Sequence, residues 1–579
     1  MVNHEYYPVH TITTIKELIY ISAEKLGERT AFQEKIGKDW KNVSFQDFLV
    51  MCEALACSLG DKGFKKGDRI AIISKNRIDW CVSYMACALS GITVVPLDRE
   101  LKEQELYHML HQSEAKGIIC SEDYIDIIFY INKQLPHLKF VISMDEKPRD
   151  NVINLNKLVD SGKQLISKGK TQPLTRDISP DTVVSMLFTS GTTGISKIVP
   201  LTHKNITSNI MATCQYVYFN ENDKWLSVLP IHHVYECTCG FLIPLYKGAG
   251  IAFTENLYKI AENAKEVQPT IMLGVPALYE SMLKKIVTTI KSKSLGSLKL
   301  SLAFGICKFY QSLRKKNIGA RVFKELHEKF GGKVRLFISG GAAANPEVSK
   351  MFQKFGFTFI QGAGMTEVSP IYALNPEWYY KHASIGLPLP GEQLTILNPN
   401  TNGVGEIAVK GESVFGGYLN APEVNQECFI DGWFRTGDMG YKDDEGYYFI
   451  TGRMKNVIVT PGGKNIYPEE IESWLNKSPF ILESLVWGGP ENNVNEDVHA
   501  IIVPDFEYLD QHCRLNNIIK SEEEIKRIIA KEIKTYCSHL SVYKRVKRFQ
   551  IRNEEFPKTT TKKIKRYLVL SRVLHESEI

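Results

Sequence analysis

The sequence predicts an α/β protein with a large N-terminal domain of βαβ units and a small α+β C-terminal domain. Strand-like apolar runs alternate with helical patterns, in the order RIAIISKN, residues 80–89, ITVVPLD, residues 103–112 and AKGIICSED. Such alternation is typical of parallel strands that helices cover on both faces. The same rhythm returns in PTIMLGVPALYESM and VRLFISGGAAANPEVSKMFQKF, so we expect the large domain to span residues 1–452.

The texture of the sequence changes after Gly452. Elements become shorter and lysines more frequent, and an alternating segment, HAIIVPD, precedes a helical pattern over residues 521–536. We therefore expect a small C-terminal domain over residues 453–579. Two domains fit a length of 579 residues, which allows up to about four domains.

The composition is that of an ordinary globular protein. Apolar residues make up 44% and charged residues 23%, which excludes a dominant disordered or fibrous region. The net charge of +6 is too small over this length to indicate a nucleic-acid partner. The 12 cysteines contain no CxxC pair and no zinc-ligand spacing, so we expect most of them to be buried, reduced thiols.

Two observations bear on location. The opening MVNHEYYPVHTITTIKEL lacks a basic segment followed by an apolar run, as a secretory signal would have. The best apolar run, CGFLIPLY at residues 239–246, is far shorter than the roughly 20 residues of a membrane-spanning helix. We therefore expect a cytoplasmic protein that does not cross a membrane.

Residues 281–324 carry eleven Lys or Arg and no Asp or Glu. Within this segment Leu298, Leu302, Ile306, Phe309 and Leu313 recur at helical spacing, with Lys299, Lys308, Arg314 and Lys315 off that stripe. One interpretation is a core-packed helix with a solvated basic face. The other is an amphipathic patch that rests on an anionic membrane, at the inner face for a cytoplasmic protein.

The strongest indication of chemistry is MLFTSGTTGISKIVPLTH, residues 186–203, where an apolar strand runs into a loop rich in glycine and hydroxyl groups. Gly191 and Gly194 let backbone N–H groups converge on an anion. Hydroxyl donors and a charge come from Thr189, Ser190, Thr192, Thr193 and Lys197. The spacing is not that of a Walker loop, and no GxGxxG follows a strand. We expect this loop to bind phosphate.

Five more motifs follow in order: ISGGAAANPE (338–347), QGAGMTE (361–367), GWFRTGD (432–438), GRMKNVIVTPGGKNIYPEEIE (452–472) and FPKTTTKKIKR (556–566). Together with residues 186–203, this ordered set closely resembles the adenylate-forming, AMP-binding superfamily. That superfamily includes acyl-CoA synthetases, luciferases and the adenylation domains of peptide synthetases. The resemblance implies a large domain that binds an acid and ATP, and a small domain that rotates between two half-reactions.

The resemblance also implies where ATP and Mg²⁺ bind. Nucleotide contacts fall on Thr189, Ser190, Gly191, Thr192, Thr193, Gly194, Lys197, Gly341, Ala342, Ala343, Gly362, Ala363, Gly364, Asp438 and Arg453. Glu367 can hold Mg²⁺ beside the triphosphate, and Thr366 can donate to the α-phosphate. Asp438 can accept both ribose hydroxyls, and Arg453 is expected to reach the ribose. The structural alternatives are a helix-capping acid for Glu367, a turn residue for Asp438 and an interdomain salt bridge for Arg453.

Lys563 is the predicted catalytic cation. When a carboxylate attacks the α-phosphate, two anions meet, and a cation shared between them lowers the barrier. Lys563 is selected by its register against the PKTxxGK pattern of the family. The neighbours Lys558, Lys562, Lys565 and Arg566 leave a solvated basic tail as the alternative. Lys562 stands where the family has Gly, and Ala363 stands where it commonly has an aromatic that stacks on adenine.

Three further positions are assigned by the resemblance. Lys455 lies at the expected hinge, where an exposed polar residue can absorb a backbone rotation, and an ordinary surface lysine is the alternative. Gly462 and Gly463 are expected to line the thiol channel. His233 is expected to flank the acyl carboxylate and to gate the pantetheine tunnel, with a core histidine as the alternative. Adjacent His232 and His233 point in different directions and do not indicate a metal site.

These assignments predict an acid–thiol ligase that uses ATP, Mg²⁺ and CoA. A carboxylate and ATP give an acyl-adenylate and pyrophosphate, and a thiol then takes the acyl group and releases AMP. No protein nucleophile is required. The basic insertion before VRLFISGG resembles that of long-chain fatty acyl-CoA synthetases, so the expected acid is a fatty acid. The alternatives are an acyl carrier protein as acceptor, a peptide-synthetase-type adenylation enzyme, or an inactive nucleotide-binding homologue.

Overall fold

A computed structural model describes the fold of this chain. The described residues are 5–147, 149–189, 196–291, 296–314, 318–342, 345–459, 465–491, 495–560 and 563–576. Packing divides the chain into unit 1 (Met1–Leu394 and Val409–Phe434) and unit 2 (Thr395–Ala408 and Arg435–Ile579). The boundary predicted at residues 452/453 lies inside unit 2. It stays a prediction, because packing within a unit does not locate the residues about which a domain rotates.

Unit 1 contains a seven-stranded sheet in the order β7–β6–β5–β3–β4–β8–β9. Its strands are β3 (Arg69–Ile73), β4 (Thr93–Pro96), β5 (Gly117–Cys120), β6 (Phe140–Ser143), β7 (Ile153–Asn154), β8 (Val183–Thr189) and β9 (Lys197–Thr202). Strands from β7 to β8 are parallel, and β9 pairs antiparallel with β8. The connecting helices are α3 (Ile78–Ser90), α4 (Glu103–Ser113) and α5 (Ile125–Asn132). This confirms the predicted βαβ units.

The second sheet of unit 1 has nine strands in the order β16–β15–β14–β13–β12–β10–β11–β1–β2. They are β1 (Thr30–Ile36), β2 (Asp39–Ser44), β10 (Lys224–Ser227), β11 (Gly250–Phe253), β12 (Ile271–Gly274), β13 (Leu336–Ser339), β14 (Thr358–Gly364), β15 (Ile371–Leu374) and β16 (Leu387–Pro388). The inner strands from β14 to β1 are parallel, and antiparallel strands flank them on both sides. Because β10, β13 and β14 run in the same direction, the loops that follow them all leave the sheet at the edge formed by the carboxyl ends of the strands.

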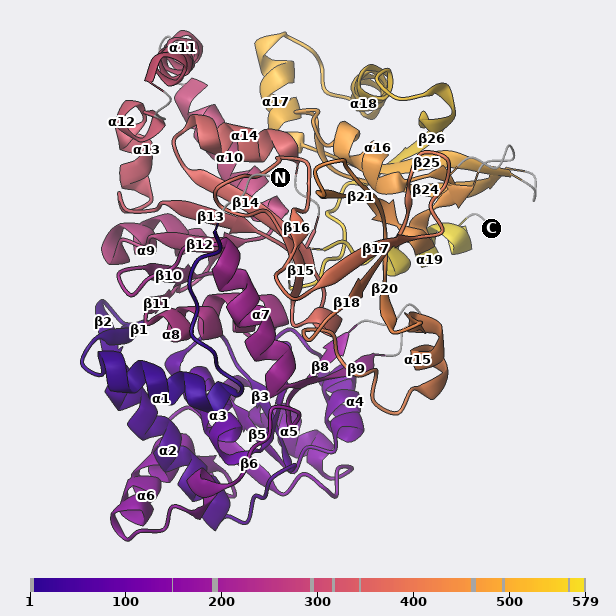
Figure 1. Ribbon diagram of the computed structural model, residues 1–579. Coiled ribbons are helices and arrows are strands. Elements are labelled where there is room, and N and C mark those ends of the chain that lie inside the picture. Colours follow the sequence, from indigo (N-terminus) through magenta and orange to yellow (C-terminus); the bar gives the residue numbers. More distant parts are fainter. Residues whose placement is uncertain are drawn as a thin grey trace. The chain divides into compact units, whose positions relative to one another are not determined.

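Helices surround these two sheets. They are α1 (Ile15–Leu26), α2 (Phe45–Asp61), α6 (Leu155–Ser167), α7 (His203–Tyr216), α8 (Ile243–Lys247), α9 (Ile260–Val267), α10 (Pro276–Lys291), α11 (Gly296–Arg314), α12 (Gly319–Val322), α13 (Lys324–Lys329), α14 (Pro346–Lys354) and α15 (Pro422–Cys428). Figure 1 shows α2 and α6 side by side at the lower left. Strands β4 and β5 are buried along their whole length, which explains their uninterrupted apolar runs.

Unit 2 holds most of a five-stranded sheet formed by β17 (Gln393–Leu397), β18 (Gly405–Lys410), β19 (Phe429–Ile430), β20 (Trp433–Lys442) and β21 (Tyr448–Arg453). It also contains the hairpin β22 (Ile458–Val459) and β23 (Asn465–Ile466), and the sheet β24 (Ile481–Glu491), β25 (Asn495–Pro504) and β26 (Arg548–Ile551). Its helices are α16 (Pro468–Leu475), α17 (Phe506–Leu515), α18 (Glu522–Cys537) and α19 (Arg566–Glu576). The predicted α+β character is present in this part of the chain.

The apolar stripe of α11 is exposed, which contradicts its interpretation as a core-packed surface. Leu298, Leu302, Ile306 and Phe309 have exposed fractions of 57%, 59%, 54% and 66%. The helix packs instead through Leu300, Cys307 and Phe304, whose ring contacts those of Phe323 and Phe355. The repeat along the helix was predicted correctly, but a second apolar face covers the core.

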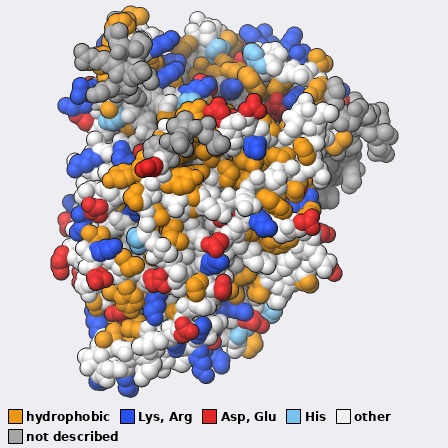
Figure 2. Space-filling model, in the orientation of Figure 1, with side chains coloured by type: hydrophobic (Ala, Val, Ile, Leu, Met, Phe, Trp, Pro, Cys, Tyr) orange, Lys and Arg blue, Asp and Glu red, His pale blue; other side chains and the backbone are white. Residues whose placement is uncertain are grey.

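The cysteines and the charged side chains are distributed as the composition predicts. All 12 cysteines are unbridged, and every one except the partly exposed Cys428 is buried, which confirms the predicted burial. Figure 2 shows Lys and Arg side chains interspersed with Asp and Glu side chains on the drawn face, in keeping with the small net charge. Among the described residues, no helix has both the length and the apolar content for crossing a bilayer.

The contact between α2 and α6 depends on the glycine at position 162. A Cβ atom at Gly162 would lie 1.8 Å from the carbonyl oxygen of Ala54. We expect Gly162→Ala to separate the two helices and to destabilise unit 1 by about 1–3 kcal/mol, measured as a lower unfolding midpoint. The control is Gly305→Ala in exposed α11, where no atom lies within 4 Å of the added Cβ. Equal midpoints for both variants would contradict this packing argument.

Candidate functional site

The predicted phosphate loop closes a β-hairpin. Strand β8 ends at Thr189 and β9 begins at Lys197, and these two residues are paired across the antiparallel ladder. The hairpin therefore brings the first hydroxyl and the terminal cation of the motif together. Ser190, Gly191, Thr192, Thr193 and Gly194 lie outside the described residues, so their role stays a prediction.

A carboxylate, a phenol and a cation meet beside this hairpin. Glu367 is 5% exposed and lies in a short 3₁₀ turn, Thr366–Val368, just after β14. Its Oε1 accepts a 2.7 Å hydrogen bond from the hydroxyl of Tyr418. The Nζ of Lys197 lies 4.9 Å from the centroid of the Tyr418 ring. We call Lys197, Tyr418 and Glu367 the Lys–Tyr–Glu cluster.

Electrostatics in the cluster favour a neutral phenol at Tyr418. Burial raises the pKa of Tyr418 well above its usual range, and the carboxylate of Glu367 raises it further. Tyr418 therefore stays protonated and acts as a donor. The carboxylate oxygens of Glu367 are ligands that Mg²⁺ prefers, and the ammonium of Lys197 suits a phosphate oxygen. Together with the half-buried Thr366 hydroxyl, these groups fit a metal–phosphate ligand.

The glycines before Glu367 allow strand β14 to lie close to the backbone that follows it. Strand β14 pairs with β15 so that Gly362 lies opposite Leu374 and Ala363 lies opposite Ala373. A Cβ atom at Gly364 would lie 1.9 Å from the carbonyl oxygen of Pro370. Close approach of the strands thus explains this glycine without a ligand. Ala363 is 8% exposed, and its contact with adenine stays a prediction.

The loop after β13 carries the other predicted glycine. Gly341 has a φ of +87°, a conformation that L-residues rarely adopt. Ala342 follows it with an exposed side chain. Both leave the sheet at the edge where β14 ends. Ala343 lies outside the described residues, so its nucleotide contact stays a prediction.

The two histidines follow β10 at the same edge. The Nδ1 of His233 accepts the backbone N–H of Tyr235 at 3.3 Å, which leaves Nε2 as the ring nitrogen that carries the proton. The Nε2 of His232 lies 3.6 Å from an Oδ2 of Asp98. Among the described residues, no three His, Cys, Asp or Glu side chains form a group that could hold a metal.

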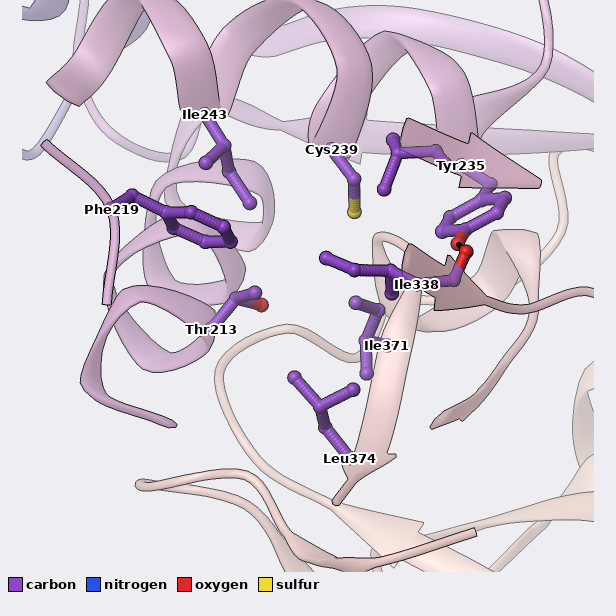
Figure 3. A pocket seen from close by; sticks show the side chains of 9 residues that line it. Thr213, Phe219, Tyr235, Cys239, Ile243, Ile338, Ile371 and Leu374 are labelled. Carbon is purple, nitrogen blue, oxygen red and sulfur yellow. Dashed lines mark hydrogen bonds between the residues drawn. The ribbon is translucent and has the colours of Figure 1, made fainter. Parts of the chain in front are cut away.

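A narrow apolar cavity is lined in part by Tyr235, two residues after His233 (Figure 3). Its volume is about 10 Å³, which is room for about one water molecule. The lining residues are Thr213, Phe219, Tyr235, Cys239, Ile243, Leu273, Ile338, Ile371 and Leu374. The cavity in this conformation is too small for a fatty acyl chain.

In unit 2, Asp438 and Arg453 face each other across β20 and β21. The Nε of Arg453 lies 2.8 Å from Oδ1 of Asp438, and an Nη of Arg453 donates to the carbonyl oxygen of Thr436 at 3.1 Å. Asp438 is 5% exposed. The structure thus brings together the two residues that the motifs assign to the ribose, and the guanidinium fixes the carboxylate.

Lys563 lies in a loop that its own backbone closes. The N–H of Thr559 donates to the carbonyl oxygen of Lys563 at 2.8 Å, and the N–H of Lys563 donates to Oγ1 of Thr559 at 3.1 Å. Its side chain is exposed. Two nearby cations are held inside unit 2, since Lys558 pairs with Glu483 and Arg566 pairs with Glu472. Because these two cations form ion pairs, the segment around Lys563 is not a wholly solvated basic tail.

The remaining predicted positions are only partly described. Lys455 has an exposed side chain in a 3₁₀ turn, Met454–Asn456, that follows β21. Its role as a hinge stays a prediction. Gly462, Gly463 and Lys562 lie outside the described residues, so the thiol channel and the departure at Lys562 are not tested.

Sequence reasoning missed Tyr418 and the polar contacts that support the histidine loop. Tyr418 follows two glycines in FGGYLN, which hint at a tight loop but not at a partner 51 residues away. Ser227 lies in β10, Glu236 in the π-helix that follows it, and Asn76 in the loop between β3 and α3. Only the folded chain brings such residues together.

The comparisons with known proteins agree with this geometry. The sequence pattern of the AMP-binding enzyme family matches residues 20–419. A long-chain-fatty-acid–CoA ligase of Bacillus subtilis (strain 168) is 29% identical, with 96% of this chain and 94% of that protein covered. Fatty acyl-CoA synthetase B of Dictyostelium discoideum is 27% identical, with 89% and 80% covered.

The fold of this chain is also similar to that of a solved structure. The crystal structure of the anthranilate CoA ligase AuaEII in complex with anthranoyl-AMP superposes with a TM-score of 0.77 and 20% sequence identity. The match covers 100% of this chain and 99% of that one. At this identity the likeness concerns the fold, and it confirms the predicted α/β class.

Replacing Tyr418 tests the Lys–Tyr–Glu cluster. Tyr418→Phe keeps the ring beneath Lys197 but removes one hydrogen bond to a buried carboxylate, which we expect to cost about 1.5–3 kcal/mol of stability. The measurement is chemical denaturation followed by fluorescence. The control is Tyr258→Phe, since Tyr258 is 95% exposed. A Tyr418→Phe variant as stable as the control would show that this hydrogen bond is dispensable.

Proposed function

Because the chain belongs to the AMP-binding enzyme family, we propose that it activates a fatty acid with ATP and transfers the acyl group to CoA. In the first step a carboxylate oxygen attacks the α-phosphate, so that an acyl-adenylate forms and pyrophosphate leaves. In the second step the sulfur of the thiol attacks the acyl carbon, and AMP leaves. The observation that carries this proposal is the Lys–Tyr–Glu cluster at the end of the β8–β9 hairpin, within the matched region.

Each residue has a task that follows from charge. Lys197 and the loop after Thr189 bind the polyphosphate, and Thr366 donates to the α-phosphate. Glu367 holds Mg²⁺, which when bound neutralises part of the phosphate charge. Asp438, oriented by Arg453, accepts the ribose hydroxyls.

The small C-terminal domain supplies the mobile cation. We assign residues 453–579 to it, with Lys455 at the hinge and Gly462 and Gly463 beside the incoming thiol. Its exposed Lys563 stabilises the charge that develops as carboxylate and phosphate approach each other. Two hydrogen bonds between Lys563 and Thr559 fix the backbone at Lys563, whose side chain is exposed.

The names of the relatives support the choice of acid and acceptor. The Bacillus subtilis and Dictyostelium discoideum proteins are named as a long-chain-fatty-acid–CoA ligase and a fatty acyl-CoA synthetase. We therefore propose a long-chain fatty acid and CoA as the substrates. We assign to His233, which follows β10 at the same ends of the strands as Glu367 after β14, the role of flanking the acyl carboxylate. An acyl carrier protein is the competing acceptor.

Lys563→Ala tests the activation step. We expect fatty-acid-dependent exchange of pyrophosphate into ATP in the unmodified protein, and a fall of about a hundredfold to a thousandfold in the variant, as for other losses of a transition-state donor. Lys565→Ala removes a neighbouring positive charge and should retain the exchange. Short-, medium- and long-chain acids, with CoA and acyl carrier protein compared directly, identify the substrates. Undiminished exchange in Lys563→Ala would falsify the role of this cation.

We also propose that residues 281–324 rest on an anionic membrane surface. The exposed stripe of α11 forms a shallow groove lined mainly by Leu298, Leu302, Ile306, Phe309 and Tyr310. The side chains of Lys299 and Lys308 are exposed beside it. The segment contains eleven Lys or Arg and no Asp or Glu. Apolar insertion and attraction to anionic headgroups then act together, at about 1 kcal/mol for each cation near the surface.

Vesicle sedimentation tests this surface. We expect anionic vesicles to retain the protein, neutral vesicles to retain less, and salt to release it, because headgroup attraction is screened. The double variant Leu302→Ser/Phe309→Ser should bind less. The control is Leu515→Ser/Ile519→Ser, which removes two apolar side chains with exposed fractions of 76% and 89% from unit 2. Equal recovery from neutral and anionic vesicles would exclude this contact.

A further inference from the structure

A buried acid lies in a π-helix three residues after His233. Glu236 is 1% exposed and begins the π-helix Glu236–Leu242 between β10 and α8. Its Oε1 accepts a 2.5 Å hydrogen bond from Oγ of Ser227. Its Oε2 is buried without a hydrogen-bond partner among the described residues. Such an oxygen is costly in a carboxylate and less costly in a protonated acid. π-Helical turns are frequent at functional sites.

The surroundings keep this acid neutral. Burial raises the pKa of Glu236 to about 8, and the hydrogen bond from Ser227 offsets only part of that effect. The titratable groups that interact with it are Tyr235, Cys237, Cys239 and, from α10, Tyr279. Burial raises the pKa of each of these groups as well. Among these neighbours none is a cation that would compensate a carboxylate.

The carboxyl group fills the space that a side chain at position 240 would need. A Cβ atom at Gly240 would lie 2.5 Å from Cδ of Glu236 and 2.6 and 2.8 Å from its two oxygens. The acid is thus wedged inside its own helical turn. On the same segment Tyr235, Cys239 and Ile243 line the apolar cavity of Figure 3.

Hydrogen bonds connect Glu236 with the loop that carries the histidines. Ser227, which donates to Glu236, accepts from Nδ2 of Asn76 at 3.0 Å. The same amide group of Asn76 donates to the carbonyl oxygen of Leu229 at 2.7 Å, and its Oδ1 accepts the N–H of Ile231 at 3.0 Å. His232 and His233 follow directly. Displacement of the carboxyl group would therefore reach the backbone just before both histidines.

We propose that Glu236 is a positioning residue, whose protonated carboxyl group, wedged against Gly240 and bonded to Ser227, holds the loop that presents His233 to the fatty acid. The part that concerns the fatty acid rests on the proposed function. The part that concerns the neutral, loop-supporting acid rests on geometry alone. Two experiments address these parts separately.

The first experiment measures the thermal midpoint from pH 4 to pH 9. The unfolded chain releases the proton of Glu236 near its ordinary pKa of 4.5, whereas the folded chain holds it until about 8. The unfolded state thus binds fewer protons between these values, and this group lowers stability as pH rises through them. Glu236→Gln keeps an acceptor for Ser227 and has no proton to hold. The thermal midpoint of Glu236→Gln minus that of the unmodified protein should increase as the pH rises from about 4.5 to about 8, and should then level off.

A midpoint difference that stays constant across this range would overturn the proposal that Glu236 is protonated.

Glu392→Gln is the matched control for the second experiment. Glu392 is also buried, its pKa is raised by burial, and its carboxyl group lies where a Cβ of Gly411 would be. Its Oε1 accepts from the N–H of Ser413, away from Ser227 and Asn76.

The second experiment measures KM for the fatty acid and for ATP by pyrophosphate exchange. Glu236→Ala should raise KM for the fatty acid about tenfold or more, because small displacements of a site residue have large effects, while KM for ATP stays unchanged. Glu236→Gln should restore it, and Glu392→Gln should leave it unchanged. An unchanged KM for the fatty acid in Glu236→Ala, with exchange intact, would overturn the positioning role.

Two outcomes keep the proposals distinguishable. If the unmodified protein shows no fatty-acid-dependent exchange, the proposed function fails, and the pH profile still decides whether Glu236 is neutral. If Glu236→Ala does not fold, Gly240→Ala replaces it, because the added Cβ displaces the same carboxyl group. Gly240→Ala should raise KM for the fatty acid in the same way. An unaltered KM in a folded Gly240→Ala variant contradicts the proposal.

Discussion

The direction of parallel strands is the constraint on which unit 1 depends. Strands β10, β12, β13 and β14 run the same way in one sheet, so every loop at their carboxyl ends emerges at one edge. Three polar motifs, spread over more than 130 residues of sequence, occupy that edge: the histidines after β10, Gly341 after β13, and Glu367 after β14. A functional edge follows from topology before any side chain interacts with another.

Burial of acids is the second constraint, and the protein meets it in three ways. Glu367 accepts a hydrogen bond from Tyr418, Asp438 pairs with Arg453, and Glu236 keeps its proton. Each solution suits the neighbours at hand: a phenol, a guanidinium, or only apolar and neutral groups. A buried carboxylate needs a donor or a cation, and where neither is present protonation is the cheaper state.

Local patterns predicted the fold class and the places of the motifs, because strands, helices and glycine loops depend on neighbouring residues. The βαβ order from β3 to β5, the helix α18 and the strand β25 all follow from periodicity. What could not be predicted depends on distant contacts. Tyr418 meets Glu367 across 51 residues. The exposed stripe of α11 has the same repeat as a buried one, and only the packing of Phe304 against Phe323 and Phe355 decides which face is covered.

The charge balance explains why a modest net charge is compatible with binding two anions. An excess of six cations is small for 579 residues, so attraction at the site has to arise from nearby groups. Unit 1 offers Lys197 over the ring of Tyr418, whose hydroxyl donates to Glu367, and an acid near the histidines that carries no charge. Unit 2 offers Arg453 on a carboxylate and Lys563 on an exposed loop. Neutralising acids is as effective as adding cations, because a bound anion responds to the sum of nearby charges at low dielectric rather than to the total for the molecule.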